Sequence, residues 1–243
     1  MKKTIKALCF DVFGTVTDWR GSVIQEAIEI TGQLGVDVPW GEFVDKWRKD
    51  GYVDSLLKIS SGEMDYISTQ KIHMKKLRLL LSDYNIDSLS ELEVNHLNLA
   101  WNRILAWPDS LEGLQMMKDD FLIMPFSNGD FRCLLDIAKH NRLPWDAIIS
   151  ADFFKKVKPD ISIYDDAAKM LCLEPEEIMM VACHAQDLDA ARKAGFRTAY
   201  VNRPLEFGAG VAQEVKSETY DFDAHDFVDL AAMLRVAKLK GEI

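Results

Sequence analysis

Cysteine is scarce in this sequence. The chain holds four cysteines in 243 residues, at positions 9, 133, 172 and 183, and no two of them have CxxC spacing. Disulfide frameworks and structural zinc sites need cysteines at close, regular spacing. The sequence therefore argues against both, and it favours a reducing cytoplasm as the location of the protein.

Long apolar runs and positive charge are lacking as well. No stretch approaches the roughly 20 apolar residues of a membrane span. The apolar run after the basic segment 1–6 is short and meets Asp11, which is too early for a signal peptide. The formal net charge of −10 opposes nucleic-acid binding. We therefore expect no membrane and no nucleic-acid partner, and any site for an anion must supply its own positive groups.

Apolar runs alternate with helix-like stretches along most of the chain. With 48% hydrophobic residues, the 243 residues can bury a sizeable core. The expected strands cover residues 5–13, 121–126, 147–153, 178–183 and 198–201, and the expected helices cover 110–118, 131–140, 161–171, 188–194 and 228–239. Strand followed by helix, repeated, predicts an α/β fold with a doubly wound, Rossmann-like parallel sheet that carries helices on both faces.

Residues 18–104 follow a different pattern. Apolar residues recur there at three and four positions, as in Val23, Ala27 and Ile30, and glycines mark the turns. This spacing predicts a helical insertion between the first strand and the rest of the sheet. We therefore divide the chain into a core of residues 1–17 and 105–243 and a helical domain of residues 18–104. The segment beyond Glu206 is polar and contains glycine, before the final helix.

Polar side chains follow several of the expected strands. Asp11, Ser127 and His184 stand at strand ends, Asn128 follows Ser127, and Lys158 follows the third run after a short loop. In parallel sheets, ligands bind beyond the carboxyl ends of the strands. A carboxylate in the position of Asp11 can act as a nucleophile or a metal ligand. The alternative is that it only caps the next turn.

Several segments together carry a resemblance to a known family. They are Phe10-Asp11-Val12-Phe13-Gly14-Thr15-Val16, Ser127-Asn128-Gly129, Lys158-Pro159-Asp160, Tyr164, and residues 187–195. In this order and spacing, over nearly its whole length, the chain resembles the haloacid dehalogenase superfamily. The resemblance implies an α/β core with an Asp nucleophile and a helical cap inserted after the first strand.

Most members of that superfamily are magnesium-dependent phosphatases, and two positions separate this chain from them. Phosphatase members carry a second Asp two residues after the nucleophile, where this chain has Phe13. They also carry a magnesium-binding Asp four residues before the position of Asp187, where this chain has Cys183. A thiol is a poor ligand for a hard cation. We therefore expect no metal and no cofactor. A magnesium-dependent phosphatase acting on a small phosphate ester, and a catalytically idle scaffold, remain alternatives.

The pattern resembles instead the 2-haloacid dehalogenase (type II) branch of the superfamily. That resemblance implies hydrolysis of short 2-haloacids such as chloroacetate through an ester on Asp11, with release of halide and a 2-hydroxy acid. It also implies roles for individual residues: Arg48 receives the halide, Lys158 pairs with Asp11, and Asp187 lies near the hydrolytic water. The resemblance implies a substrate site made up of Phe13, Thr15, Ser127, Asn128 and Tyr164. It makes Tyr164 a partner of Lys158 as well. Related dehalogenases are often dimers, which suggests a homodimer here.

One segment departs from the best-known members of that branch. Where they have Ser-Ser-Asn-Ala-Trp, this chain has Ala182-Cys183-His184-Ala185-Gln186. It is similar to a sub-branch with an Ala-x-His pattern and Trp107-Pro108-Asp109, some members of which defluorinate small haloacids. His184, as a neutral imidazole, either activates water or only shapes the pocket, and in the second case Asp187 is the water base. The preferred halogen, chain length and enantiomer stay open.

Overall fold

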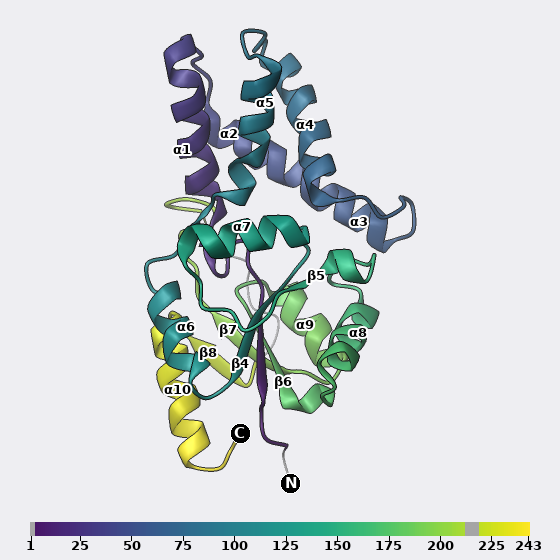
Figure 1. Ribbon diagram of the computed structural model, residues 1–243, viewed down its shortest axis with the longest axis vertical. Coiled ribbons are helices and arrows are strands. Elements are labelled where there is room, and N and C mark those ends of the chain that lie inside the picture. Colours follow the sequence, from purple (N-terminus) through teal and green to yellow (C-terminus); the bar gives the residue numbers. More distant parts are fainter. Residues whose placement is uncertain (1–2, 212–218) are drawn as a thin grey trace.

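A six-stranded sheet forms the centre of the computed structural model, which describes residues 3–211 and 219–243 (Figure 1). The strand order is β5-β4-β1-β6-β7-β8, and every neighbouring pair is parallel. The strands are β1 (Ala7–Phe10), β4 (Leu122–Ser127), β5 (Ile149–Ser150), β6 (Ile178–Ala182), β7 (Arg197–Val201) and β8 (Phe222–Ala224). Residues 1–2 of the basic N-terminal segment and residues 212–218 of the polar tail lie outside the described residues.

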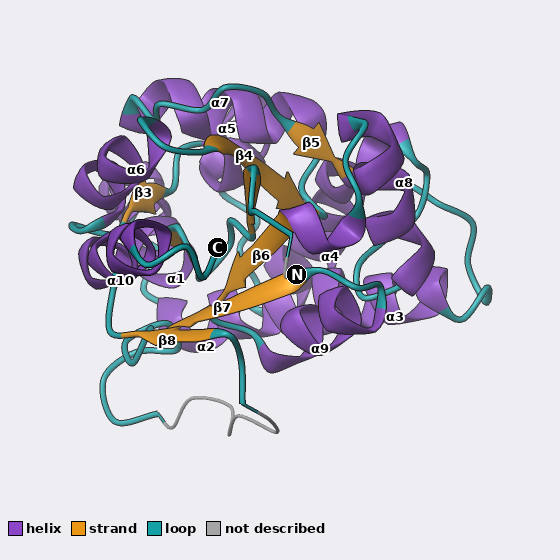
Figure 2. Cartoon of the chain, turned by 90° about the horizontal axis from the view of Figure 1, so that it is seen from below, coloured by secondary structure: helices purple, strands orange, loops and turns teal. Residues whose placement is uncertain are grey.

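Helices cover both faces of this sheet (Figure 2). On one face pack α6 (Ser110–Lys118), α7 (Phe131–Asn141) and α10 (Phe227–Leu239), and on the other α8 (Ile161–Leu171) and α9 (Ala185–Lys193). Because successive side chains of a strand point to opposite faces, Leu8 and Phe10 of β1 enter the first core, and Ala7 and Cys9 enter the second. Burial on both faces explains the unbroken apolar run of β1. The predicted doubly wound α/β class is confirmed.

The expected strand 5–13 is shorter in the structure, where β1 covers Ala7–Phe10. Both edge strands of the six-stranded sheet also differ from the prediction. The expected strand 147–153 shrinks to β5, because the Ser150 hydroxyl accepts a hydrogen bond from the Asp152 amide at 3.1 Å and starts the 3-10 turn η4 (Ala151–Phe153). The sequence does not predict β8, whose three residues are too few for a clear periodic signal. None of these differences changes the order of the strand ends that carry polar residues.

Helices stand above the carboxyl ends of the strands and make up most of the insertion (Figure 1). They are α1 (Trp19–Thr31), α2 (Trp40–Lys46), α3 (Asp54–Ser60), α4 (Thr69–Asp83) and α5 (Glu91–Asn98), with a π-helical turn, η2 (Trp47–Val53), between α2 and α3. At the neck, β2 (Thr17–Asp18) pairs antiparallel with β3 (Leu105–Ala106). We propose this pair as the boundary between the core, residues 1–17 and 105–243, and the cap, residues 18–104. Among the described residues, no helix has the length and apolar character needed to cross a membrane.

The cap docks on the core through the first turn of α4. The Asp130 carboxylate, just before α7, accepts hydrogen bonds from the Thr69 and Gln70 amides, both at 2.7 Å. Nearby, the Tyr66 hydroxyl donates to Asp152 at 2.7 Å. The free N–H groups and the positive end of the helix dipole make a helix N-terminus a favourable partner for a carboxylate. These contacts hold the cap beside the carboxyl ends of the strands.

Candidate active site

Asp11 directly follows β1 and is buried. Its amide donates to the Val181 carbonyl of β6 at 2.9 Å, which keeps its backbone in line with the strand. Oδ1 lies 3.2 Å from Lys158 Nζ, while Oδ2 accepts the Thr15 hydroxyl at 2.8 Å and lies 3.1 Å from His184 Nδ1. Burial alone would raise the pKa of Asp11, but Lys158 and His184 outweigh burial and hold that pKa below its usual value. The side chain is therefore a carboxylate at neutral pH.

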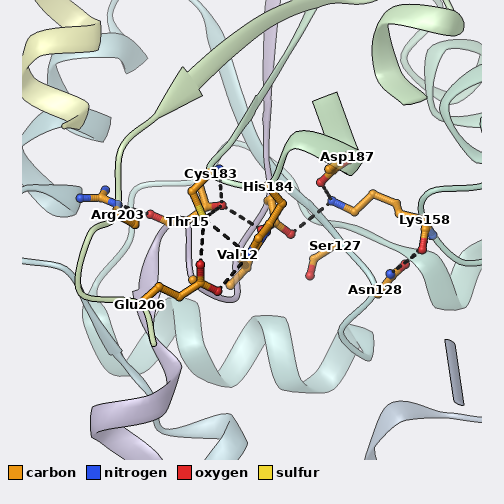
Figure 3. A network of polar contacts seen from close by, with 12 residues as sticks. Val12, Thr15, Ser127, Asn128, Lys158, Cys183, His184, Asp187, Arg203 and Glu206 are labelled. Atoms are coloured by element: carbon orange, nitrogen blue, oxygen red, sulfur yellow. Dashed lines mark hydrogen bonds and ion pairs between the residues drawn. The ribbon is translucent and has the colours of Figure 1, made fainter. Parts of the chain in front are cut away.

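Lys158 joins two buried carboxylates. Its Nζ contacts Asp187 Oδ2 directly and Asp11 Oδ1 at 3.2 Å, and Figure 3 shows it reaching Asp187. Burial lowers the pKa of Lys158, but Asp187 and Asp11 more than compensate and raise it above its usual value. The side-chain amide of Asn128 fixes the backbone of Lys158. Its oxygen accepts from Lys158 N at 2.7 Å, and its nitrogen donates to the Lys158 carbonyl at 3.0 Å. Lys158 is thus a fixed positive charge.

Asp187, in the first turn of α9, is held from two sides. The Tyr164 hydroxyl donates to Oδ1 at 2.5 Å, and Lys158 contacts Oδ2. Burial raises the pKa of Asp187, and Lys158 offsets this only in part, so Asp187 is a stronger base than an exposed carboxylate. The substrate-site role predicted for Tyr164 stays a prediction. Helix α8 places its ring behind Asp187 against Phe126, fully buried and away from the cavity described below.

His184 lies between two carboxylates. Its Nδ1 is 3.1 Å from Asp11 Oδ2. Its Nε2 is 2.9 Å from Glu206 Oε1, and Figure 3 shows these two side chains side by side. Burial lowers the pKa of His184, but Cys183, Glu206 and Asp11 together raise it well above its usual value. Burial also raises the pKa of the Cys183 thiol, so the charges that hold the proton belong to the carboxylates. The neutral imidazole expected from the sequence does not fit this position, because an imidazolium has no lone pair with which to accept a proton from water.

Glu206, on the loop after β7, is a site residue that the motifs do not reveal. It is 1% exposed, and its Oε1 accepts the Trp19 indole N–H at 3.1 Å in addition to facing His184. Gly14, with a φ of +92°, leaves room for it, because a Cβ on Gly14 would lie 2.2 Å from Glu206 Oε1. The signal that points to Glu206 is its place after the expected strand 198–201, at the same edge of the sheet as Asp11.

A second network holds the loop that carries Thr15. Arg203 Nε donates to the Thr15 carbonyl at 2.8 Å, and its two terminal nitrogens bind the Asp109 carboxylate at 2.7 and 2.9 Å. The Trp107 indole N–H donates to the Gly14 carbonyl at 2.8 Å. The Trp107-Pro108-Asp109 segment noted in the sequence therefore acts on the backbone that positions the Thr15 hydroxyl.

A cavity of about 510 Å³ opens between the cap and the core. Residues predicted for the site that line it are Asp11, Phe13, Arg48, Asn128, Lys158, His184 and Asp187. Thr15 and Ser127 lie behind these residues. The Thr15 hydroxyl is engaged by Asp11, and Ser127 Oγ accepts the Gly129 amide at 3.2 Å.

Arg48 reaches the cavity from the π-helical turn η2, a feature that is frequent at functional sites. Its Cζ lies 4.7 Å from the ring centroid of Tyr52 and 5.0 Å from that of Trp19. Its Nη1 is buried and has no hydrogen-bond partner among the described residues. A buried N–H without a partner costs free energy, and an anion that accepts from it removes this cost. The cavity is thus equipped with a free donor for an anion.

Three of the described residues offer donor atoms that could hold a metal ion. Cys183 Sγ, His184 Nε2 and a Glu206 oxygen lie within 4.8 Å of one another. A hard cation such as Mg²⁺ prefers an octahedron of oxygens, and this group supplies a single carboxylate. The donors also contact one another, with Glu206 at 2.9 Å from His184 and 3.6 Å from Cys183. We assign them to a hydrogen-bond network.

Comparisons with known proteins agree with one another. A family model for haloacid dehalogenase-like hydrolases matches residues 5–195. The chain is 27% identical over 207 residues to (S)-2-haloacid dehalogenase 4A of Burkholderia cepacia. This alignment covers 84% of this chain and 85% of the relative. Among solved structures, it is similar to a defluorinating L-2-haloacid dehalogenase, with 36% identity, a TM-score of 0.91 and 95% of each chain covered. A second L-2-haloacid dehalogenase has 35% identity and a TM-score of 0.91, with 96% of this chain and 99% of that one covered.

Proposed function

The chain belongs to the haloacid dehalogenase-like hydrolases, and we propose that it hydrolyses the carbon–halogen bond of short 2-haloacids to give a 2-hydroxy acid and halide. One observation carries this proposal: a buried, ionised Asp11 lines the same cavity as an Arg48 donor that has no partner among the described residues. The relatives named as 2-haloacid dehalogenases support it. The protein is thus a hydrolase that acts on carbon–halide bonds.

The first step is attack by Asp11 on carbon. Among the described residues, Oδ2 has two donors and Oδ1 has only Lys158, so Oδ1 keeps the more available lone pairs. Oδ1 forms a bond to C2 of the haloacid while the bond from C2 to the halogen breaks, and the halogen leaves with the electron pair as halide. Arg48 Nη1 donates to the departing halide, and one such donor in a site without water contributes about 3–4 kcal/mol. Phe13 and Asn128 remain proposed substrate contacts.

The second step is hydrolysis of the ester on Asp11. Water adds to Cγ of Asp11 and gives one proton to Asp187. The tetrahedral intermediate expels the former Oδ1 as the product oxygen, which takes that proton from Asp187 and becomes the hydroxyl group. Asp11 keeps the oxygen of the water and releases the remaining proton to solvent. Of the two water bases that the sequence leaves open, Asp187 is favoured because the raised pKa of His184 keeps its ring protonated.

Phosphatase chemistry is not supported at this site. Phe13 occupies the position of the phosphatase acid, and its ring lines the cavity, where it has no proton to give to a leaving alkoxide. Cys183 occupies the position of a magnesium ligand, and its sulfur contacts Thr15 and Glu206. The relatives named as dehalogenases also favour cleavage of carbon–halogen bonds over phosphate esters.

The names of the relatives narrow the substrate. One solved relative is described as defluorinating, and the curated relatives are named for (S)-2-haloacids. We extend the proposal to fluoroacetate and to the (S)-enantiomers of longer 2-haloacids. Cys9, Cys133, Cys172 and Cys183 are all free thiols, in keeping with a reducing compartment. Cytoplasmic location and a homodimer remain predictions.

Halide release by the purified chain tests the proposed function. We expect chloroacetate, fluoroacetate and (S)-2-chloropropionate to yield equal amounts of halide and 2-hydroxy acid, and we expect this rate to survive EDTA. Asp11→Asn removes the nucleophile and should lower halide release to background. Asp87→Asn, an exposed cap residue, is the matched control and should keep the rate of the unaltered protein. Magnesium-dependent release of phosphate from p-nitrophenyl phosphate, with no halide from any haloacid, would contradict the proposal.

A further inference from the structure

Neither His184 nor Glu206 transfers a proton or forms a bond in the two steps above, although both belong to the polar network at Asp11. Asp11 Oδ2 accepts the Thr15 hydroxyl at 2.8 Å and lies 3.1 Å from His184 Nδ1, and the other ring nitrogen lies 2.9 Å from Glu206 Oε1. We propose that His184, held by Glu206, forms with Thr15 an oxyanion site for Asp11 Oδ2 during hydrolysis of the ester. This inference rests on the proposed function and deepens it.

Hydrogen-bond chemistry determines the protons on the His184 ring. An ionised carboxylate only accepts hydrogen bonds, and each ring nitrogen faces one, at Asp11 and at Glu206. Both nitrogens therefore donate, which makes the ring an imidazolium, and the raised pKa of His184 agrees. The ring thus presents a charged N–H to Oδ2.

Glu206 is buried in a way that suits this contact. A carboxylate that is 1% exposed is costly unless a charge and hydrogen bonds compensate it. His184 supplies the charge, and Trp19, the first residue of α1, supplies a second donor at 3.1 Å. Gly14 leaves the space that the carboxylate fills. The turn after β1 and the first helix of the cap therefore both define where Glu206 holds the imidazolium.

The charge on His184 has its main effect after the ester has formed. In the ester, Oδ2 is a neutral carbonyl oxygen, and it becomes an oxyanion when water adds to Cγ. The oxyanion then lies between the Thr15 hydroxyl and the His184 N–H. A donor that meets a full charge only in the transition state accelerates that step. In the first step Asp11 loses negative charge, so the imidazolium gives no such help there.

Charged and titratable groups reach His184 from several elements. They are Asp11 after β1, Cys183 after β6, Tyr200 on β7, Glu206 after β7, and Arg48 of the cap, which acts on Glu206. Burial raises the pKa of the Cys183 thiol, and it raises the pKa of Tyr200 to about 12, so neither is ionised at neutral pH. Once Asp11 is esterified, Glu206 is the remaining anion, among the residues that the structure describes, in contact with the ring.

Glu206→Gln tests the proposal, because it keeps the shape of the side chain and removes its charge. In rapid-quench measurements we expect one halide per active site at the rate of the unaltered protein. Turnover should then be about 10- to 100-fold slower, a loss comparable to that for removing a group that orients a ligand. An ester on Asp11 should accumulate in the mass spectrum. Because Glu206 helps to hold the His184 proton, the fall of kcat at high pH should move to lower pH in the variant.

His184→Asn is the second variant, and it decides the question if Glu206→Gln does not fold. We expect the burst to change far less than the steady turnover, which should be slower by about 10²-fold. Glu26→Gln breaks a 2.6 Å pair with Arg103 in the cap and should behave like the unaltered protein. An unchanged pH profile in Glu206→Gln, or a slower burst without ester in His184→Asn, would overturn the proposal. Absence of halide release from the unaltered protein would overturn the proposed function instead.

Discussion

The two oxygens of Asp11 have different surroundings, and this difference divides the chemistry between them. Oδ1 faces the Lys158 ammonium, whereas Oδ2 is held by the Thr15 hydroxyl and the His184 ring. An oxygen that accepts two strong hydrogen bonds is a weaker nucleophile, so Oδ1 attacks carbon in the proposed mechanism. Oδ2 already lies where an oxyanion is stabilised. The same side chain can therefore act first as nucleophile and then as electrophile without rotating.

Arg48→Met tests the residue that we assign to the halide. The substitution keeps an unbranched apolar side chain near Tyr52 and Trp19 and removes the donor that has no partner in the described part of the chain. We expect the burst of halide to slow by about 10²–10³-fold, because Arg48 acts in the first step. Rapid-quench kinetics measure this rate, and Arg78→Met, at an exposed cap pair with Glu91, is the control. A normal burst would remove Arg48 from the first step.

Motif positions predict the residues that react better than the residues that hold them. Asp11, Lys158 and Asp187 were predicted because they occupy positions that the resemblance assigns. Glu206 was not, because no local pattern links it to Asp11 and only the packing of strand ends brings the two together. The charge of His184 was missed for the same reason, since it depends on both of these neighbours.

At the scale of elements, the first turn of α4 is capped twice, once by the residue that precedes the helix and once from the core. Ser68 Oγ accepts the Lys71 amide at 3.4 Å, and Asp130 accepts the Thr69 and Gln70 amides at 2.7 Å. Asp130 immediately precedes α7 but makes no side-chain cap to that helix. The core therefore provides a capping carboxylate to a helix of the cap, which couples the order of α4 to contact between the two parts.

Asp130→Ala should loosen this contact. We expect the free energy of unfolding to fall by about 0.5–2 kcal/mol, the usual range for loss of a helix cap. Hydrogen exchange at the amides of residues 69 and 70 should become faster, because both lose their acceptor. Asp83→Ala, at the other end of the same helix, is the control and should leave these amides unchanged. Full protection of the two amides in Asp130→Ala would show that other contacts dock α4.

The boundaries of helices and strands were predicted best for several inner elements of the core. Helices α6 and α8 begin and end at the predicted residues. Strand β6 keeps its predicted start because both of its faces are buried and its apolar run is continuous. The boundaries of the edge strands β5 and β8 were predicted less well, because short strands give little periodic signal.

At the scale of the whole molecule, the site compensates for a negative surface. The chain carries a formal net charge of −10, which repels anionic substrates at long range. Four carboxylates and four cations line the cavity and balance one another: Asp11, Asp45, Asp187 and Glu206 against Arg48, Lys49, Lys158 and His184. Lys158 is paired with Asp11 and Asp187. His184 is paired with Glu206 and Asp11. Arg48 thus keeps an N–H that no residue of 3–211 or 219–243 occupies and that can bind an incoming anion. Arg48 comes from the cap, whereas Asp11 comes from the core.

A single turnover in water enriched in ¹⁸O tests the central claim, covalent attack by Asp11, most directly. With the protein in excess over chloroacetate, the oxygen that joins C2 comes from Asp11 and the water oxygen stays on the protein. We therefore predict an unlabelled hydroxyl group in the first glycolate formed and one ¹⁸O atom in the peptide that contains Asp11, both read by mass spectrometry. Labelled glycolate from the first turnover, with an unlabelled Asp11 peptide, would mean that water attacks carbon directly, and it would contradict the mechanism.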